Sequence, residues 1–466
     1  MPAFVAVQRA VGRKVVEGRG KGVDSMTEGL SKQEPAAVEY MSRHEIDELQ
    51  LERLKRVLGL VWERVPVYRE KLEKARVTPE DLKSLSDVCR LPFTTKADFR
   101  DTYPFGLLAV PLADVVRLHA SSGTTGKPTI VAYTRRDIDT WSEIMARALA
   151  LGGAGREDIV HNAFGYGLFT GGLGFHYGAE RLGAAVIPMS GGFTERQIKA
   201  FTDLGSTVLC CTPSYALHLA EALQEAKVSP DRLKLRVGFF GAEPWTEGMR
   251  EAIESRLNLA ALNIYGLSEV MGPGQAVECL ARRGMHVAED HFLAEVVDPV
   301  TLEPVPPGSE GELVLTSLTK EALPVLRYRT RDLTAIESEP CPCGRSLRRI
   351  RRIKGRTDDM LIIRGVNVYP SQIEEVLTRL PEVEPHYLLV VRRERALDTL
   401  EINVEPCGEL AGMSTTAASE LAAKVRRKIY DIAGVTAEVR LVPPKTLERS
   451  VGKAKRVQDL RQSLRA

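Results

Sequence analysis

SSGTTGKPTIVAYT, residues 121–134, places small hydroxyl residues, two glycines and a lysine directly before a β-branched run. Gly123 and Gly126 allow backbone torsions that let successive N–H groups turn inward on a phosphate. A P-loop needs four residues between its glycine and Gly-Lys, and a Ser or Thr after the lysine. Here two residues intervene and Pro128 follows Lys127. A polar hairpin turn is the structural alternative, but so many phosphate-compatible residues together favour a phosphate-binding loop.

The segments around this loop predict an α/β fold. From the loop to about residue 270, apolar β-rich runs such as AAVIPM, STVLCC and LRVGFF alternate with helical segments, which indicates a parallel sheet. Upstream, residues 45–75 have helical periodicity that Pro66 is expected to interrupt, and residues 91–107 form a loop-and-helix link. Residues 301–333 are alternating and turn-rich, which suits antiparallel strands in a small β-barrel part.

A small α+β unit is expected after residue 358. Its predicted elements are a helix at 371–380, strands at 387–392 and 399–404, a helix at 417–431 and a strand at 438–442. The expected organisation is therefore an N-terminal extension over 1–39, a large domain over 40–357 and a small domain over 358–466.

Several motifs give the chain a resemblance to the adenylate-forming enzymes, the acyl-CoA synthetases and their relatives. SSGTTGKPT resembles their phosphate loop, and four further motifs follow in the family's order: YGLSE (265–269), YRTRD (328–332), GRTDDMLIIRG (355–365) and SVGKAKRV (450–457). Two other stretches resemble the phenylacetate–CoA ligase branch: FGYGLFTGGLGFHYGAERLG (164–183) and FGAEPWT (240–246). The resemblance runs from about residue 40 to the C-terminus.

This resemblance implies an enzyme that joins an arylacetic acid, phenylacetate above all, to coenzyme A. ATP would form an acyl-adenylate and release diphosphate, and thioester formation would then release AMP. ATP, Mg²⁺ and coenzyme A are the implied cofactors and co-substrates. The alternative activity is AMP transfer to a deazaflavin, as in coenzyme F390 synthetase. An adenylate-binding protein without turnover is disfavoured because Glu269, Asp332 and Lys453 are all present.

The composition is compatible with an enzyme that acts on small-molecule substrates. The 466 residues predict two or three domains, and a net charge of +2 gives no reason to expect nucleic acid or a membrane as partner. No apolar run approaches the ~20 residues that span a bilayer. Seven cysteines, an odd number, argue against a secreted disulfide framework. We therefore expect a cytoplasmic protein, with which a homodimer is compatible. The extension over 1–39 is expected to be flexible, and its first 25 residues are either a basic tail or upstream sequence before a start at Met26 or Met41.

The resemblance assigns the ATP site to three groups of residues. They are Ser122, Thr124, Thr125, Gly126 and Lys127 in the phosphate loop, Gly241, Ala242, Glu243, Tyr265, Gly266 and Ser268 around the adenine, and Asp332 and Arg356 at the ribose. Tyr265 would be the flat partner of the base, and Asp332 would accept bonds from both ribose hydroxyls. The structural alternative for Asp332 is an ion pair with Arg329 or Arg331.

Two residues are expected to serve the chemistry. A carboxylate must attack the α-phosphorus of ATP although both are anions, so catalysis needs charge neutralisation and positioning. Glu269 would organise Mg²⁺, a hard cation that prefers oxygen ligands; its alternative is a solvated loop glutamate. In the family's Gly-Lys register, Lys453 would bridge the substrate carboxylate and the α-phosphate. Lys455 and Arg456 are its rivals.

Asp358 resembles the pivot about which relatives rotate the C-terminal domain after adenylation, and such hinges concentrate the φ/ψ change in a few residues. Gly365 would let the pantetheine arm of coenzyme A pass close to the backbone. Many relatives carry Arg two residues later, where this chain has Asn367, so no phosphate contact is expected there.

An apolar slot for an aryl ring is implied by five positions that match the branch: Phe164, Phe169, Ala242, Ile264 and Pro273. Such a slot suits a phenyl ring. The alternative is that the aromatic side chains belong to the core. Position 164 is often Tyr in the branch, and Phe164 here lacks that hydroxyl.

Four residues form a candidate structural zinc site. Cys279 lies seven residues before His286, and Cys341 and Cys343 stand in a Cys-Pro-Cys-Gly sequence. Three thiolates and one imidazole are a known zinc set, although C-x-C is tighter than the usual spacing. His291 is a rival ligand, and buried reduced cysteines are the alternative.

Overall fold

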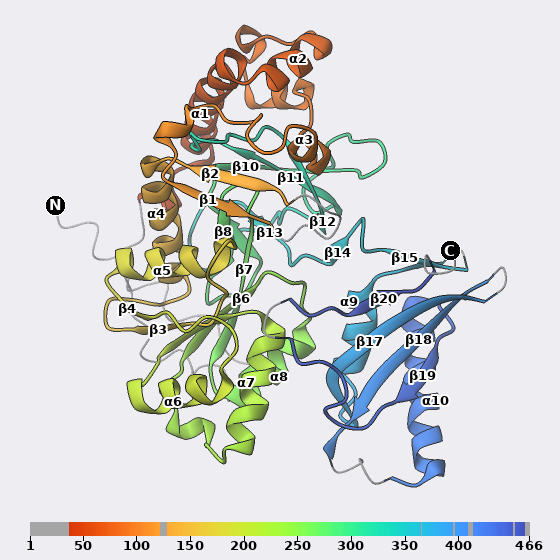
Figure 1. Ribbon diagram of the computed structural model, residues 1–466. Coiled ribbons are helices and arrows are strands. Elements are labelled where there is room, and N and C mark those ends of the chain that lie inside the picture. The colour runs from red at the N-terminus through yellow and green to blue at the C-terminus, as the bar shows by residue number, and fades with distance from the viewer. Residues whose placement is uncertain are drawn as a thin grey trace.

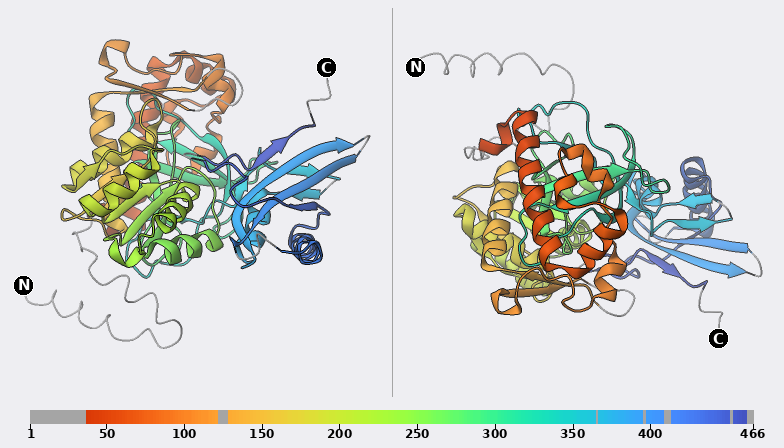
Figure 2. Two further views of the ribbon diagram at one scale, coloured as in Figure 1. Left: turned by 60° about the horizontal axis from the view of Figure 1, so that its bottom comes forward. Right: turned by 90° about the horizontal axis from the view of Figure 1, so that it is seen from above.

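The molecule consists of two bodies of unequal size (Figures 1 and 2). A computed structural model describes residues 37–121, 128–364, 366–394, 397–408, 413–450 and 453–461. Residues up to Ile350 form two hydrophobic clusters, and a third, separate cluster begins at Leu361. The smaller body lies to one side of the larger, where α9 (Pro370–Thr378) contacts α8 (Glu247–Leu257). Within these ranges, no helix has the length and apolarity that crossing a membrane requires.

The N-terminal helices follow the predicted pattern. A capping box between Ser42 and Glu45 starts α1 (Arg43–Arg64), and Pro66 occupies the first turn of α2 (Pro66–Ala75), so the predicted break at this proline is confirmed. The link into the β1–β2 hairpin contains α3 (Lys96–Asp101).

An eight-stranded sheet organises the larger body, in the order β13-β9-β8-β7-β6-β5-β3-β4. The strands β4, β3, β5, β6 and β7 run parallel, as the sequence predicted, whereas β7, β8, β9 and β13 pair antiparallel. Their bounds are β3 (Ile159–Asn162), β4 (Ala185–Ile187), β5 (Val208–Cys211), β6 (Val237–Gly241), β7 (Ala260–Leu267), β8 (Gly272–Glu278), β9 (Met285–Val287) and β13 (Arg349–Ile350).

Helices cover both faces of this sheet. On β6, Phe239 joins the cluster of α4 (Arg135–Leu151) and α5 (Thr170–Leu182), while its neighbour Phe240 joins the cluster of the opposite face. That second cluster contains residues of α6 (Thr194–Leu204), α7 (Pro213–Glu225) and α8. Alternate side chains of a strand point to opposite faces. The strand is therefore apolar throughout because both faces are buried.

An antiparallel sheet of four strands, β10-β11-β12-β14, forms from the turn-rich segment and its flanks. Its strands are β10 (Phe292–Val297), β11 (Gly311–Ser317), β12 (Tyr328–Thr334) and β14 (Gly355–Arg356). β12 pairs with β14 so that Asp332 lies opposite Arg356. The antiparallel pairing thus brings together two residues that are far apart in sequence.

The hairpin of β1 (Arg117–Ala120) and β2 (Ile130–Tyr133) brackets the phosphate-loop motif. The Ser121 N–H donates to the Thr129 carbonyl at 2.9 Å, which extends the pairing by one step. The predicted ligands Ser122, Thr124, Thr125, Gly126 and Lys127 lie outside the described residues, as does Gly365.

The smaller body is an α+β unit, as predicted. Its sheet has the order β19-β18-β17-β20 and lies against α9 and α10 (Thr415–Ala433). The strands are β17 (Val383–Glu394), β18 (Leu397–Pro406), β19 (Glu438–Leu441) and β20 (Val457–Asp459), and β15 (Leu361–Ile363) pairs with β16 (Val366–Val368) near its start. The sequence did not predict β20, which runs parallel to β17 and anchors the chain just after Lys453.

Glycine permits the close approach of α4 and α5. A Cβ atom on Gly178 would lie 2.4 Å from the Cβ of Met145 and 3.0 Å from its carbonyl carbon. Neither atom belongs to the flexible end of a side chain, so a larger residue would force the helices apart. Gly59 in α1 has no atom within 4 Å of such a Cβ.

We predict that Gly178→Ala lowers the free energy of unfolding of the larger body by about 2 kcal/mol, because overpacking strains the helix pair. Gly59→Ala is the matched control and should raise it by up to about 1 kcal/mol, since alanine favours a helix interior. All three tryptophans belong to the larger body, so urea unfolding followed by their fluorescence reports on it. Equal stability of the two variants would contradict the packing account.

Candidate active site

An acidic cluster around the buried Asp332 lies where β7, β12 and β14 meet. The Tyr265 hydroxyl donates to Asp332 Oδ2 at 2.5 Å, and Arg356 Nη1 donates to Asp332 Oδ1 at 3.2 Å. Arg356 also holds Asp358 through two hydrogen bonds of 2.8 and 2.9 Å. Burial raises the pKa of Asp332 to about 6, although Arg356, Tyr265 and Lys453 each lower it.

The ion pairs around Asp332 differ from the structural alternative considered for it. Arg329 forms two hydrogen bonds to Glu312, at 3.1 and 2.6 Å, and Arg331 also approaches Glu312, at 3.7 Å. Both arginines thus face away from Asp332, whose cationic partner is Arg356.

Glu269 is buried rather than solvated, with 7% of its surface exposed, just after β7. Its charge acts on the pKa of the buried Lys320, Tyr133 and Tyr328. The ammonium of Lys320 lies 4.5 Å from the Tyr133 ring centroid and has no hydrogen-bond partner among the described residues. Burial lowers the pKa of Lys320 to about 8, against the charges of Asp137 and Glu269. Sequence reasoning missed this lysine because a lone lysine between strands carries no pattern.

The segment after β6 lines the same region. Gly241 must be glycine because a Cβ there would lie 2.1 Å from the Ile264 carbonyl oxygen, and Ala242 turns the chain with φ of 70°. The carboxylate of Glu243 accepts the backbone N–H of Ser214 and that of Ala454, each at 2.8 Å. Its side chain is thus committed to α7 and to the smaller body.

Gly266 and Ser268 of the YGLSE motif each contact a neighbouring segment of the larger body. A Cβ on Gly266 would lie 2.1 Å from the Gly272 carbonyl oxygen, so the strands approach closely at this point. The Ser268 hydroxyl lies 2.9 Å from that of Thr170, at the start of α5.

The predicted aryl-pocket residues divide into two groups. Phe164 is buried and stacks on Phe175 with 4.9 Å between ring centroids, and Ile264 joins the same cluster. The Pro273 carbonyl accepts a hydrogen bond of 3.0 Å from the Trp141 indole. Phe169 and Ala242, by contrast, are exposed.

Lys453 belongs to the smaller body, and its side chain is exposed. The charge of Lys453 acts on the buried Asp332 and on Asp359, an exposed carboxylate. The rival Arg456 is committed elsewhere, because it pairs with Glu374 and donates to Ser214 Oγ at 3.0 Å. Lys453 and Lys455 are both exposed, so exposure does not separate them. Of the three, only Lys453 has a charge that acts on the pKa of Asp332.

Further ion pairs join the two bodies beside this loop. Glu221 on α7 accepts from His386 Nε2 at 2.6 Å and from Arg449 Nε at 3.1 Å. Arg449 also binds the buried Glu405 with bonds of 3.0 and 2.8 Å. Although burial raises the pKa of Glu221, His386 and Arg449 outweigh it and lower the value to about 2.

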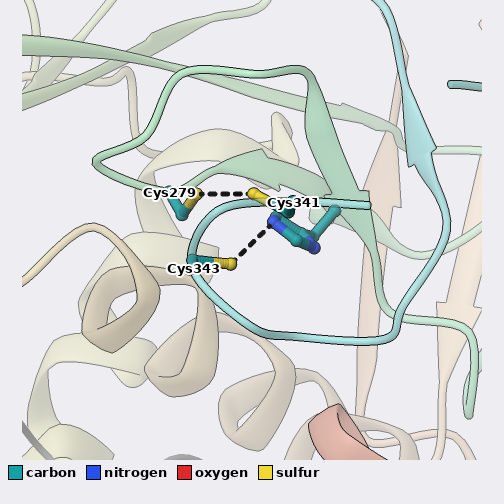
Figure 3. A group of neighbouring side chains, drawn as sticks. Cys279, Cys341 and Cys343 are labelled. Carbon is teal, nitrogen blue, oxygen red and sulfur yellow. Dashed lines mark hydrogen bonds between the residues drawn. The ribbon is translucent and has the colours of Figure 1, made fainter. Parts of the chain in front are cut away.

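The four predicted zinc ligands come together (Figure 3). Their donor atoms all lie within 4.8 Å of one another, with 3.6 Å between the sulfurs of Cys279 and Cys341 and 3.4 Å between Cys343 Sγ and His286 Nε2. Hydrogen bonds from Cys279 and His286 outweigh burial and lower the pKa of the Cys343 thiol. The rival His291 lies apart from this group, with Asp290 3.0 Å from its Nε2.

This donor set fits zinc. Tetrahedral zinc with Zn–S bonds of about 2.3 Å holds two sulfurs about 3.7 Å apart, close to the separation of Cys279 and Cys341. The thiols come from two segments: Cys279 follows β8, whereas Cys341 and Cys343 precede β13.

Comparisons with known families and sequences agree with this geometry. The family model described as AMP-binding enzyme matches residues 6–319, and that described as AMP-binding enzyme C-terminal domain matches residues 365–461. The phenylacetate-coenzyme A ligase of Thermus thermophilus is 52% identical over 91% of this chain and 98% of its own length. That of Escherichia coli K12 is 51% identical over 91% and 97%.

Solved structures of one related protein distinguish two domain arrangements. A 2-hydroxyisobutyryl-CoA ligase in the postadenylation state, bound to 2-HIB-AMP, matches with a TM-score of 0.88 at 31% identity, over 93% of this chain and 95% of that one. The same ligase with CoA in the thioesterification state matches over the same shares at 32% identity with a TM-score of only 0.68. The two bodies of this chain are therefore arranged as in the postadenylation state.

Proposed function

This chain belongs to the AMP-binding enzyme family, in its phenylacetate–CoA ligase branch, and from that membership we propose that it joins phenylacetate to coenzyme A. ATP and phenylacetate form phenylacetyl-adenylate and diphosphate, and the thiol of coenzyme A then displaces AMP. The observation that carries the proposal is that the chain is about 50% identical to such ligases over nine-tenths of its length, and it keeps a buried Asp332 on which the charge of Lys453 acts. A cytoplasmic location and a homodimeric state stay predictions.

The nucleotide is bound through the acidic cluster. Asp332 accepts the ribose hydroxyls, Arg356 adds a second contact, and the ring face of Tyr265 lies against the adenine. The triphosphate lies at the β1–β2 hairpin, where the buried hydroxyls of Ser121 and Thr129 have no partner among the described residues. Polar atoms buried in this way call for a ligand or water.

We expect two cations to offset the negative charge of the phosphates: Mg²⁺ held by Glu269, and the Lys453 ammonium. The Glu269 carboxylate is buried and forms no hydrogen bond within the described part of the chain, so its oxygens are available to a hard cation. Mg²⁺ held there would offset phosphate charge. Lys453 provides the second charge, at the α-phosphate, and losing such a contact typically costs ~10²–10³-fold in rate.

The second half-reaction needs the smaller body to rotate about Asp358 and withdraw Lys453. Asp358 is held by Arg356 in the present arrangement, so rotation must break these two bonds. Rotation would then place the Gly365 face against the thioester site.

The acid itself is recognised by apolar surface. Phe164 and Ile264 provide buried walls, and Pro273 is fixed by Trp141. Such a slot favours a phenyl ring over a methyl group.

We predict that kcat/KM for phenylacetate exceeds that for acetate by roughly 10- to 100-fold, because burying a phenyl ring contributes more transfer free energy than burying a methyl group. The measurement is AMP release with a panel of aryl acids, with and without coenzyme A. Turnover should require coenzyme A. Equal kcat/KM for the two acids would contradict the pocket assignment, and AMP transfer to F420 without coenzyme A would replace the ligase proposal.

We also predict that adenosine binding weakens about tenfold from pH 7 to pH 5. The folded pKa of Asp332 is raised to about 6, so the carboxylate that accepts the ribose hydroxyls is lost as pH falls through that value. The neighbouring charges are Arg356, Asp358 and Lys453. Calorimetry with adenosine, which lacks a titrating phosphate, measures the affinity. Asp332→Asn should bind weakly and independently of pH, and an unchanged pH dependence in that variant would exclude Asp332.

We propose that the Cys279, His286, Cys341 and Cys343 cluster binds structural zinc. Metal analysis should find about one zinc per chain in protein purified without chelators. The double variant Cys341→Ser, Cys343→Ser should lose the metal and much of its thermal stability, because structural zinc contributes folding free energy. Cys89→Ser, at an exposed and separate cysteine, is the control and should keep both. If metal analysis finds no zinc, the proposal is wrong and the group consists of ordinary cysteines.

A further inference from the structure

We infer that Glu243 is a positioning residue that clamps the Lys453 loop onto the larger body during adenylation; this inference rests on the proposed function. Glu243 follows β6 and the tight turn at Ala242. Its Oε1 accepts both the N–H and the hydroxyl of Ser214, and its Oε2 accepts the N–H of Ala454 at 2.8 Å. One side chain therefore joins α7 to the residue immediately after Lys453.

The clamp is built where a carboxylate is favoured. Ser214 lies in the first turn of α7, whose free N–H groups and dipole attract negative charge. The Ser214 hydroxyl oxygen also accepts a hydrogen bond of 3.0 Å from Arg456 Nη2. Two residues of the smaller body thus contact the Glu243–Ser214 pair: Ala454 binds Glu243, and Arg456 binds Ser214.

These contacts restrain the backbone on both sides of the Lys453 side chain. The Ser450 hydroxyl donates to the Lys453 carbonyl at 2.9 Å, Glu243 holds the next N–H, and β20 begins at Val457. The Glu221 contacts with His386 and Arg449 fix the body as a whole, but Glu243 is the contact adjacent to the lysine. Misplacing a reacting group by about 1 Å can cost 10²-fold in rate.

Adenine binding does not explain the Glu243 side chain. Both of its oxygens are already paired with protein donors, two of them backbone N–H groups. Charge-assisted bonds of this kind are among the stronger hydrogen bonds in proteins. The segment that follows the nucleotide-binding strand therefore also fixes the catalytic loop.

The test is a double-mutant cycle on single-turnover diphosphate release from ATP and phenylacetate, without coenzyme A. Glu243→Ala should slow this step about 10- to 100-fold in the wild-type background, but less than threefold in the Lys453→Ala background, because the lysine it positions is then absent. Thioester formation from ready-made phenylacetyl-adenylate and coenzyme A should stay within twofold. Glu243→Gln keeps one accepting oxygen and should restore part of the rate.

Glu251→Ala, an exposed glutamate on α8, is the control and should leave both steps unchanged. Equal losses in both backgrounds, or an equal loss in thioester formation, would overturn the inference. A matching loss of adenosine affinity in Glu243→Ala would make Glu243 a nucleotide contact instead. If Glu243→Ala does not fold, Glu243→Gln replaces it in the cycle. Its rate loss in the wild-type background is then compared with its loss in the Lys453→Ala background. Failure of the wild-type protein to form adenylate would reject the proposed function, not the clamp.

Discussion

The ion pair between the buried Asp332 and Arg356 is the interaction around which the charges near the boundary of the two bodies gather. Asp332, Asp358 and Asp359 lie together around Arg356, and the charge of Lys453 acts on two of them. Coulomb interactions between such groups are strong only where water is excluded. Burial of Asp332 and Glu269 therefore makes the site sensitive to where Lys453 lies.

The contacts between the bodies are polar, whereas the cores are separate. The hydrophobic cluster of the smaller body contains no residue of the two clusters of the larger body. The joining contacts include Glu221 with His386 and Arg449, Glu243 with Ala454, and Arg256 with Glu384. Interfaces of this kind resemble transient ones and can separate without exposing a core. Such a boundary agrees with the predicted rotation of the smaller body.

The sequence predicted the elements better than the contacts between them. The parallel strands, the break at Pro66 and the helices of the smaller body agree with the structure, because each is recorded in local periodicity or a local breaker. The four zinc-ligand candidates were also predicted together, since cysteine and histidine are rare and their chemistry is specific. The phosphate-loop residues and Gly365 lie outside the described residues, so those assignments stay predictions.

The features that the sequence did not predict are β20, the contact of Glu243 with the smaller body and the burial of Lys320. Each depends on a partner that is distant in the chain. The three residues of β20 are too few to show alternation, and they become a strand only by pairing with β17. Glu243 looked like a nucleotide contact because its motif suggests one, yet its partner Ala454 lies in the other body. Lys320 is an isolated lysine in the sequence, and only the fold buries it near Glu269.

The cysteine–histidine cluster bears on where rotation can begin. Cys341 and Cys343 hold their loop against Cys279 and His286, β13 then pairs with β9 opposite His286, and β14 pairs with β12 opposite Asp332. The chain between the cluster and Arg356 is thus attached to the larger body at several successive points, and the Thr357 N–H adds a bond of 2.8 Å to the Arg331 carbonyl. The freedom to rotate starts only after the last of these attachments. Asp358 is the next residue and its carboxylate is held by Arg356, so the predicted pivot comes directly after the last of these attachments.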